Sequence, residues 1–406
     1  KGKKLGTDEQ VLFDLAALNN VLDTARYGKA RNLIGTTFPE GTKTIAKITL
    51  AKALVAYDWK QKAIVWTLPL QRGIGHQDFC NASRSLAFTK DYNLFVTTSD
   101  GRTHQVSTDG NRKLLYGTSV HRDEFGIHKG TFWSPKGDQL AFYRMDQSMV
   151  TDYPQVNTLV SQEVRIAQPT PEKYPMTGMA MHKVTVGIFS PATDRTVWLE
   201  LGDVTDRYFT NIQWSPDSKT IYMFELNRDQ NDCRLVSYNA ETGSKIAELY
   251  RETDSKYVEP SHPILFLPWN ADQFVMQTQK DGYNHFYLFN KDGKQLKQIT
   301  KGNWVVMDVL GFNEKAKSII YVSNECSPMQ RNTWSVNVEN GTRTLLDNGR
   351  GYHYATLSGG GNYLVDNYTE PTVPRKIDIT TIGAKPTIKN WLTAKNPWNG
   401  YNIPEF

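Results

Sequence analysis

A repeated segment constrains the fold of this chain more than any other feature. Residues 133–142 read Trp-Ser-Pro-Lys-Gly-Asp-Gln-Leu-Ala-Phe, and residues 214–224 repeat the pattern as Trp-Ser-Pro-Asp-Ser-Lys-Thr-Ile-Tyr-Met-Phe. Weaker copies occupy residues 311–321 and 355–365. Each copy sets a polar turn between an aromatic or apolar strand end and a second, apolar strand. Such self-similarity indicates one supersecondary unit that is stacked several times.

A second element, a strand followed by a turn, alternates with the first. It occupies residues 234–243, 286–296 and 333–341. Asp-Gly and Asn-Gly turns, which tight hairpins favour, separate many of the short strands. The clearest strand patterns cover residues 63–68, 94–98, 139–143, 220–224 and 318–322. The two elements together make a four-stranded unit of about 45 residues, the size of a propeller blade. We therefore predict an all-β protein, a β-propeller of four-stranded antiparallel sheets.

Three parts of the chain depart from this rhythm: the N-terminal part, residues 144–184, and residues 387–406, which show little periodicity. Helical spacing of apolar residues predicts a short N-terminal helix over about residues 8–22, with Thr7 and Asp8 as N-cap candidates. Residues 144–184 are rich in proline and indicate an excursion from one blade. We accordingly divide the chain into a helix and lead-in (1–40), a propeller (41–385) and a connector (386–406).

Composition excludes several classes of protein. The net charge is +5, and Lys and Arg are scattered along the chain, whereas a nucleic-acid partner is expected to show a concentrated basic patch. No run of about 18 apolar residues predicts a membrane span. The three cysteines form no C-x-x-C pair, and the eight histidines show no metal-ligand spacing. We expect no metal and no cofactor.

Motifs for catalysis are also missing from the chain. The sequence contains no G-x-S-x-G, no H-E-x-x-H, no P-loop and no G-x-G-x-x-G after a strand. Ser358 precedes three glycines, but it occupies a turn position of the repeat. We therefore assign no catalytic residue to this chain.

Asp123 and Glu124 are the residues most able to bind a ligand. They form a short acidic turn directly before the repeat copy at residues 133–142. Adjacent carboxylates can hold a primary ammonium, and a free α-amino group with a pKa near roughly 8 is largely cationic at neutral pH. The alternative is a solvated acidic turn without a ligand. Arg122 can pair with these acids, hold a peptide carbonyl or simply lie on the surface.

At this point the chain resembles the N-terminal β-propeller of the dipeptidyl peptidase IV family of serine peptidases, within the prolyl oligopeptidase clan. The likeness extends from about residue 40 to 380. It rests on the segments 123–125, 132–135, 140–146, 174–178, 183–186, 279–287, 300–304 and 323–328.

The resemblance implies an eight-bladed propeller that caps a C-terminal α/β-hydrolase domain carrying the Ser, Asp and His. A paired-glutamate motif of the family, which binds the amino terminus of the substrate, falls here on Asp123 and Glu124, the first being one methylene shorter. Arg122 is a further candidate contact. The implied function is substrate gating in an exopeptidase that releases dipeptides or tripeptides after proline. We expect this chain to be inactive alone, and the full-length protein to be exported to the periplasm or cell envelope and to form a homodimer.

A second function stays open from the residues alone. A stand-alone β-propeller that binds a partner protein would also explain the repeats, with Asp123 and Glu124 merely solvated. A G-x-S-x-G motif downstream in the gene would favour the peptidase.

Overall fold

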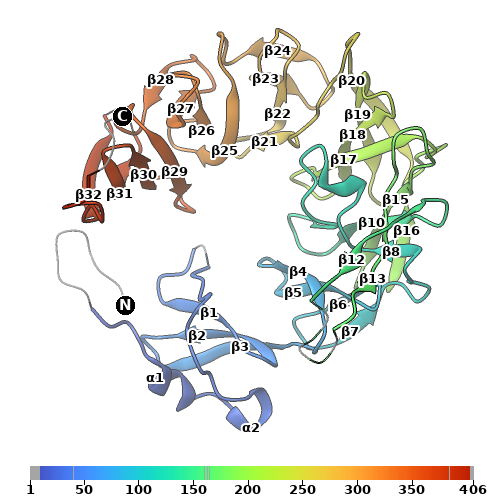
Figure 1. The fold of residues 1–406 in the computed structure, drawn as a ribbon, viewed down its shortest axis with the longest axis horizontal. Coiled ribbons are helices and arrows are strands. Elements are labelled where there is room, and N and C mark those ends of the chain that lie inside the picture. The colour runs from blue at the N-terminus through green and yellow to red at the C-terminus, as the bar shows by residue number, and fades with distance from the viewer. Residues whose placement is uncertain are drawn as a thin grey trace. The chain divides into compact units, whose positions relative to one another are not determined.

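The computed structural model describes residues 10–39, 41–159, 161, 163, 165–383 and 385–402. Nearly all regular structure in these residues is β-strand, arranged as short antiparallel sheets that follow one another along the chain (Figure 1). The sheets belong to two compact units. The larger contains Asp14–Pro39 and Lys43–Pro263, and the smaller is formed mainly by the chain from Ile264 onwards.

Among the described residues, the larger unit contains four sheets of three to five strands, two ladders of two-residue strands and two short α-helices. The helices are α1 (Leu15–Asn19) and α2 (Thr24–Tyr27). The first sheet is β1 (Ile45–Thr49), β2 (Ala53–Asp58) and β3 (Ala63–Pro69). The second is β4 (Gly75–Cys80), β5 (Ser85–Lys90), β6 (Asn93–Thr97) and β7 (Thr103–Gln105). The third is β8 (Leu114–Tyr116), β9 (Thr131–Trp133), β10 (Leu140–Asp146), β15 (Lys183–Ser190) and β16 (Arg195–Trp198). The fourth is β17 (Arg207–Trp214), β18 (Thr220–Asn227), β19 (Asp232–Asn239) and β20 (Lys245–Thr253).

The smaller unit contains three four-stranded sheets. The first is β21 (Leu265–Leu267), β22 (Asn270–Thr278), β23 (His285–Asn290) and β24 (Gln295–Gln298). The second is β25 (Val306–Asn313), β26 (Ser318–Ser323), β27 (Asn332–Asn337) and β28 (Arg343–Leu345). The third is β29 (Tyr352–Leu357), β30 (Tyr363–Glu370), β31 (Val373–Thr381) and β32 (Thr387–Thr393), so it extends past residue 385.

The described residues thus form seven blades, and the expectation of eight is wrong. The number eight came from the resemblance and not from a count of strand patterns, and the described strands pair into seven sheets of three to five strands. The excursion leaves the third sheet between β10 and β15 and adds no further blade. The described residues of the excursion, 147–159, 161, 163 and 165–182, form two ladders of two-residue strands. One pairs β11 (Asp152–Tyr153) with β14 (Glu172–Lys173), and the other pairs β12 (Val156–Asn157) with β13 (Gln168–Pro169). These strands are mostly exposed and rich in polar residues and proline, so they bury too little apolar surface to build a blade.

The N-terminal helix is shorter than the helix predicted over residues 8–22. It begins only after Asp14, whose side chain accepts a hydrogen bond from the backbone N–H of Ala17 over 2.8 Å. Leu18 and Leu22 are buried, whereas Val11 is exposed and precedes the helix. The capping interaction at Asp14 sets the start of α1. The N-cap candidates Thr7 and Asp8 lie outside the described residues.

The repeated Trp-Ser-Pro segment folds in the same way in both copies. In each, the serine N–H donates to the carbonyl five residues later, from Ser134 to Gln139 over 2.9 Å and from Ser215 to Thr220 over 2.8 Å. The same serine hydroxyl oxygen accepts the returning N–H of Gln139 and of Thr220. The weaker copy at Ser358 makes the same two hydrogen bonds with Tyr363.

The tryptophan of each strong copy links its sheet to the preceding one. The indole N–H of Trp133 donates to the carbonyl oxygen of Asp78 in β4 over 3.0 Å. That of Trp214 donates to the carbonyl oxygen of Phe132 in β9 over 2.9 Å. Inner strands such as β2, β18 and β26 are almost entirely buried, because neighbouring elements cover both of their faces. The repeat therefore encodes both the turn and the contact between successive sheets.

Candidate functional site

The acidic turn lies in a loop that leaves and rejoins one edge of β10. β8 and β9 pair with the same edge, β8 at residues 144–146 and β9 at residues 140–142. Between them, the backbone of Tyr143 bonds to Gly117 over 2.9 Å and to Gly130 over 3.0 Å. A Cβ atom on Gly130 would lie 2.1 Å from the carbonyl oxygen of Thr118, so only glycine allows the two stems of the loop to approach so closely.

The turn itself is a left-handed 3-10 turn. His121, Arg122 and Asp123 have φ angles of 54°, 58° and 62°, and Phe125 has a φ of 54°. The N–H of Asp123 donates to the carbonyl of Val120 over 3.1 Å, and that of Glu124 to the carbonyl of His121 over 3.2 Å. Left-handed backbone costs about 1–2 kcal/mol for each residue other than glycine. Consecutive residues in this conformation require strong support from their surroundings.

A pair of buried histidines supports the beginning of the turn. The ring Nδ1 of His121 lies 2.9 Å from Nε2 of His182, and the backbone N–H of His121 donates to the same Nε2 over 3.2 Å. On its other side, Nε2 of His121 accepts the backbone N–H of Phe209 in β17 over 3.1 Å. Burial lowers the pKa of both rings, that of His182 to about 4.

A β-bulge in β17 supports the end of the turn. The register of β17 against β18 shifts between Thr210 and Gln213, where Asn211 has a φ of 56°. The bulge directs the amide of Asn211 to the carbonyl oxygens of Phe125, at 3.0 Å, and Pro260. Gly126 packs so tightly that a Cβ atom there would lie 1.9 Å from the carbonyl oxygen of Ser261.

Glu124 faces a small cavity beside the turn. The cavity, of about 60 Å³, is also lined by Tyr174, Tyr208 and His182. No described residue donates a hydrogen bond to the Glu124 carboxylate or forms an ion pair with it, and partial burial raises its pKa while the nearby charge of Arg122 opposes the rise. Arg122 and Arg228 also line this cavity, and Arg228 forms an ion pair with Asp206 over 2.6 Å. A carboxylate beside aromatic rings can bind a cationic group.

Asp123 faces a different and larger cavity, of about 360 Å³, lined also by His76, Lys173 and His182. Its carboxylate accepts a hydrogen bond from the hydroxyl of Ser119. The two acids are therefore neighbours in sequence but line separate cavities.

Arg122 lines both cavities. It pairs with neither acid of the turn. Its guanidinium lies 3.7 Å from a carboxylate oxygen of Glu172 and 4.8 Å from the ring centre of Tyr174. Both partners belong to the excursion, so Arg122 joins that segment to the turn.

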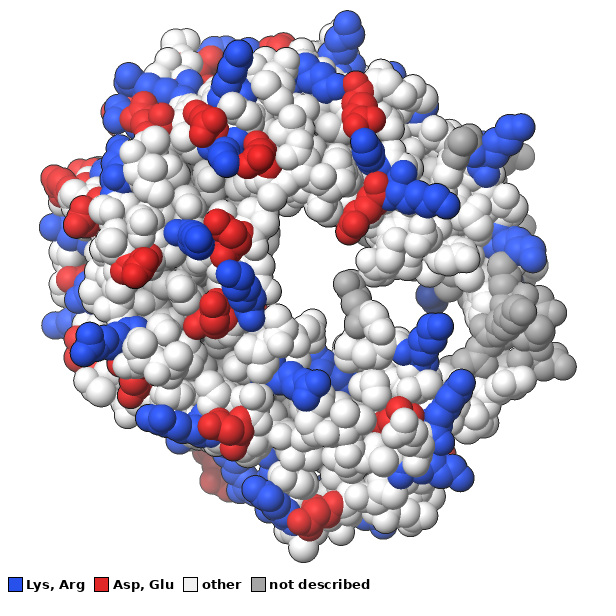
Figure 2. Space-filling model, turned by 180° about the vertical axis from the view of Figure 1, so that it is seen from behind, with Lys and Arg blue, Asp and Glu red and all other residues white. Residues whose placement is uncertain are grey.

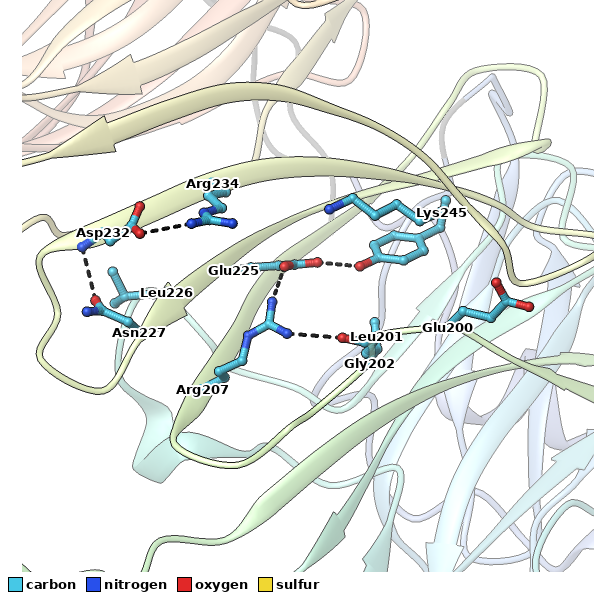
Figure 3. A pocket seen from close by; sticks show the side chains of 11 residues that line it. Glu200, Leu201, Gly202, Arg207, Glu225, Leu226, Asn227, Asp232, Arg234 and Lys245 are labelled. Atoms are coloured by element: carbon cyan, nitrogen blue, oxygen red, sulfur yellow. Dashed lines mark hydrogen bonds and ion pairs between the residues drawn. The ribbon is translucent and has the colours of Figure 1, made fainter.

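A third cavity, of about 390 Å³, lies along β17, β18 and β19 (Figure 3). Several polar side chains that line this cavity form hydrogen bonds with one another. The carboxylate of Glu225 accepts hydrogen bonds from Arg207 and from the hydroxyl of Tyr238, and Arg207 also donates to the carbonyl of Leu201 over 3.0 Å. At its edge, Arg234 lies 3.1 Å from Asp232. These polar groups form hydrogen bonds and ion pairs with one another. We therefore interpret them as a structural ion-pair network that lines the cavity.

The smaller unit contains a buried histidine, His353, whose pKa is raised, whereas the pKa values of His121 and His182 are lowered. Nδ1 of His353 lies 2.7 Å from Asp366 and 3.7 Å from Asp347, and its Nε2 lies 2.7 Å from the carbonyl oxygen of Arg350. Burial alone would lower the pKa of His353, but the hydrogen bond to Asp366 and the charge of Asp347 outweigh it and raise the pKa.

The surface carries both signs of charge. On the face seen in Figure 2, Lys and Arg side chains are interspersed with Asp and Glu side chains among the described residues. In the same part of the chain, no group of three or more His, Cys, Asp or Glu residues is placed to hold a metal ion. None of the described helices is long and apolar enough to cross a membrane.

Comparison with known families assigns the chain. The profile of the Dipeptidyl peptidase IV (DPP IV) N-terminal region matches residues 38–375. The chain belongs to this family. Its larger fungal relatives include proteins named "Probable dipeptidyl-aminopeptidase B" from Pyrenophora teres, 28% identical over 74% of this chain, and from Phaeosphaeria nodorum, 29% identical over 76%. The chain spans about 36–37% of the length of these two relatives.

Solved structures share the fold of this chain. A crystal structure from Bacteroides ovatus, described as that of "a putative dipeptidyl aminopeptidase IV", has a TM-score of 0.88 and 41% identity over 98% of this chain and 58% of its own. Porphyromonas gingivalis dipeptidyl peptidase 4 has a TM-score of 0.71 at 24% identity, over 86% of this chain and 48% of its own, and so supports the fold.

Sequence reasoning found the turn but missed its supports. His121 could have been identified from the sequence, because it directly precedes Arg122 and the two acids. His182 and Asn211 carry no local signal, because the turn meets them only through the fold, across 61 and 86 residues of chain.

Proposed function

We propose that this chain is the substrate-recognition propeller of a dipeptidyl-aminopeptidase-like serine exopeptidase, and that the turn at residues 121–126 binds the amino terminus of a peptide. The observation that carries the proposal is the position of Glu124. The carboxylate of Glu124 has no hydrogen-bonding partner among the described residues, and it lines a small cavity together with two tyrosines. The backbone of the turn is held by contacts of His121, which accepts a hydrogen bond from Phe209.

The chemistry suits a primary ammonium. A cavity of about 60 Å³ accommodates an ammonium group, since one water takes about 30 Å³ of liquid volume. A charge-assisted hydrogen bond from the ammonium to Glu124 contributes about 1.5–3 kcal/mol. The engagement of Arg122 with Glu172 and Tyr174 draws its charge towards the excursion. Asp123 contributes at longer range, from the neighbouring cavity.

Bond cleavage belongs, in this proposal, to a C-terminal hydrolase domain of the parent protein. The longer relatives support this division, since the chain matches 36–38% of their length. The propeller then selects slender peptides with a free amino terminus and aligns them for the hydrolase. Residues 1–406 alone bind such peptides and do not hydrolyse an aminoacyl-prolyl chromogenic substrate. We also propose that the parent protein is exported and dimeric.

Calorimetric titration tests the assignment. The probe is Ala-Pro-Ala with a free amino terminus, and its N-acetylated form is the comparison. We expect the unmodified chain to bind the free tripeptide at least about 10-fold more tightly than the acetylated one, which corresponds to one charge-assisted hydrogen bond. Glu124→Gln removes this preference, and Asp123→Asn reduces it less.

The matched control is Glu314→Gln, which neutralises an exposed glutamate of the smaller unit. It leaves the preference unchanged. Equal affinity of the unmodified chain for both peptides, or an undiminished preference in Glu124→Gln, would contradict amine recognition by this turn.

A further inference from the structure

We infer that His182 is a positioning residue for the acidic turn: it holds His121, and through His121 the left-handed conformation that presents Glu124. The inference rests on the proposed function of the turn. His182 lies at the end of the excursion, directly before β15, and is 61 residues from His121 in the chain.

The hydrogen bonds define the tautomer of both rings. The Phe209 N–H donates to Nε2 of His121, so this nitrogen carries no proton. A neutral His121 therefore carries its proton on Nδ1 and donates it to Nε2 of His182 over 2.9 Å. The backbone N–H of His121 donates to the same nitrogen over 3.2 Å. The single lone pair of this nitrogen is thus shared by two donors of His121, so that His182 serves as a double acceptor, and the proton of the neutral His182 ring lies on Nδ1.

This double acceptor acts directly on the strained part of the turn. His121 is the first of the three consecutive residues with positive φ, and both its backbone N–H and its ring are held by His182. The ring of Tyr208, 5.0 Å from that of His121, packs against the same pair. Without an acceptor at position 182, two buried donors of His121 lose their partner, and the left-handed conformation loses its main support.

Protonation would have the same effect as removal. A proton on Nε2 of His182 would face the two donors of His121 and displace both. Several titratable or charged groups face the pair from the packed elements: Arg122, Asp123 and Glu124 of the turn, Lys173 and Tyr174 of the excursion, Tyr208 of β17, Arg228 after β18, and His76 of β4. Burial and the nearby charge of Arg122 favour the neutral ring and lower the pKa of His182 to about 4.

Two variants distinguish the hydrogen-bond acceptor of His182 from the space that its side chain fills. The variant His182→Gln places an amide oxygen close to the position of Nε2 and does not titrate there, whereas His182→Leu provides no acceptor. At pH 7 we expect His182→Gln to bind Ala-Pro-Ala within about 3-fold of the unmodified chain, and His182→Leu to bind at least about 10-fold more weakly.

Nitrogen-15 spectra of the histidine rings give a readout that does not depend on a ligand. We expect Nε2 of His121 to be unprotonated and His182 to stay neutral down to about pH 5, because its pKa is about 4. In the unmodified chain, the amide signals of residues 122–124 then follow the titration of His182 near pH 4, in addition to their response to nearby carboxylates. In His182→Gln only the carboxylate response remains.

The outcomes distinguish the inference from the function on which it rests. If Glu124→Gln keeps its preference for the free amine, the proposed function is wrong. The role of His182 is then tested by the ring spectra alone. If Glu124→Gln loses the preference while a folded His182→Leu binds normally, the positioning role is wrong. Should His182→Leu not fold, the spectra decide: a His182 ring that titrates near its ordinary pKa of about 6.5 overturns the inference.

Discussion

The side-chain amide of Asn211 donates to the carbonyl oxygen of Phe125 over 3.0 Å, and so joins a bulge in β17 to a turn that lies 86 residues earlier. Such a contact fixes the turn from the side opposite to the histidine pair. Because both ends of the turn are held, the position of Glu124 depends on the integrity of the fourth sheet. Changes in that sheet should therefore affect the turn.

Substitution of Gly126 tests the tightness of this packing. We expect Gly126→Ala to lower the free energy of unfolding by roughly 2–4 kcal/mol, because the new Cβ combines left-handed strain with overpacking against Ser261. Gly341→Ala is the matched control, since Gly341 has a similar φ, +74°, with nothing within 4 Å of its Cβ position. Its cost should be only about 1 kcal/mol. Urea denaturation compares the two, and equal losses would refute the packing argument.

The proposed amine binding predicts a bell-shaped pH dependence. Above about pH 8 the α-amino group of the peptide loses its charge, and affinity falls up to about 10-fold for each pH unit. On the acid side, affinity falls as Glu124 becomes protonated, at a pH above the ordinary range for glutamate, because partial burial raises its pKa. Titration of Ala-Pro-Ala from about pH 4 to 9.5 measures both limbs. An affinity that stays constant across the alkaline limb is incompatible with recognition of an ammonium.

The two histidine clusters predict opposite effects of pH on stability. His182 has a folded-state pKa of about 4, below its unfolded value of about 6.5, so its contribution is present above about pH 6.5 and is lost as the pH falls towards 4. His353 has a raised pKa, so its contribution is complete below about pH 6.5 and is lost as the pH rises through the folded-state value.

The expected result is a maximum of stability near about pH 6.5, where both contributions are largely present. Urea midpoints measured from about pH 4 to 9 check it. His182→Gln should weaken the decline on the acid side, and His353→Gln should weaken the decline on the alkaline side. A variant that leaves its own limb unchanged would show that the corresponding histidine is not responsible.

Arg207 and Glu225 form a pair whose disruption should be costly. Glu225 is only 4% exposed, so Arg207→Met leaves a buried carboxylate without its cation. We expect a loss of about 3 kcal/mol, and a smaller loss in the double variant with Glu225→Gln. As a control, Lys317→Met removes the exposed partner of Glu339 and should cost less than about 1 kcal/mol. Additive losses in the double variant would contradict the pairing.

The link made by the repeat tryptophan is measurable in the same way. Trp214→Phe keeps most of the ring but removes the N–H that bonds to the carbonyl of Phe132. We expect a loss of about 1–3 kcal/mol, since the carbonyl of Phe132 loses its donor at a part-buried position. Trp398 is 57% exposed, and Trp398→Phe should change stability by less than about 0.5 kcal/mol. A similar small effect at Trp214 would show that the indole hydrogen bond is unimportant.

Much of the fold was predictable from the sequence because its signals are local. The strand patterns at residues 139–143, 220–224 and 318–322 correspond to β10, β18 and β26. The Trp-Ser-Pro pattern predicted the turns, since the serine makes its hydrogen bonds within five residues. The number of blades was predicted wrongly, because it was taken from the resemblance, and local strand patterns do not show how many separate sheets the strands will form.

The site was predictable only in part. The acids at positions 123 and 124 were recognisable, but their separation into two cavities follows from three left-handed residues, and nothing in the side chains of His121, Arg122 and Asp123 requires that conformation. The turn contacts His182, which the third sheet itself brings near, and Phe209 and Asn211, which become its neighbours only when the fourth sheet packs against the third. Their roles stay predictions until the variants are measured.

The indole bonds of Trp133 and Trp214 also bear on how a protein of this kind can change over time. Each bond joins a sheet to the sheet that precedes it in the chain. Deletion of a whole sheet would therefore leave an indole N–H or a carbonyl oxygen without its partner. Lengthening a connection, as residues 147–182 do, leaves both bonds in place. New surface can therefore be added at the loops without breaking these two bonds, while a change in the order of the sheets would break them.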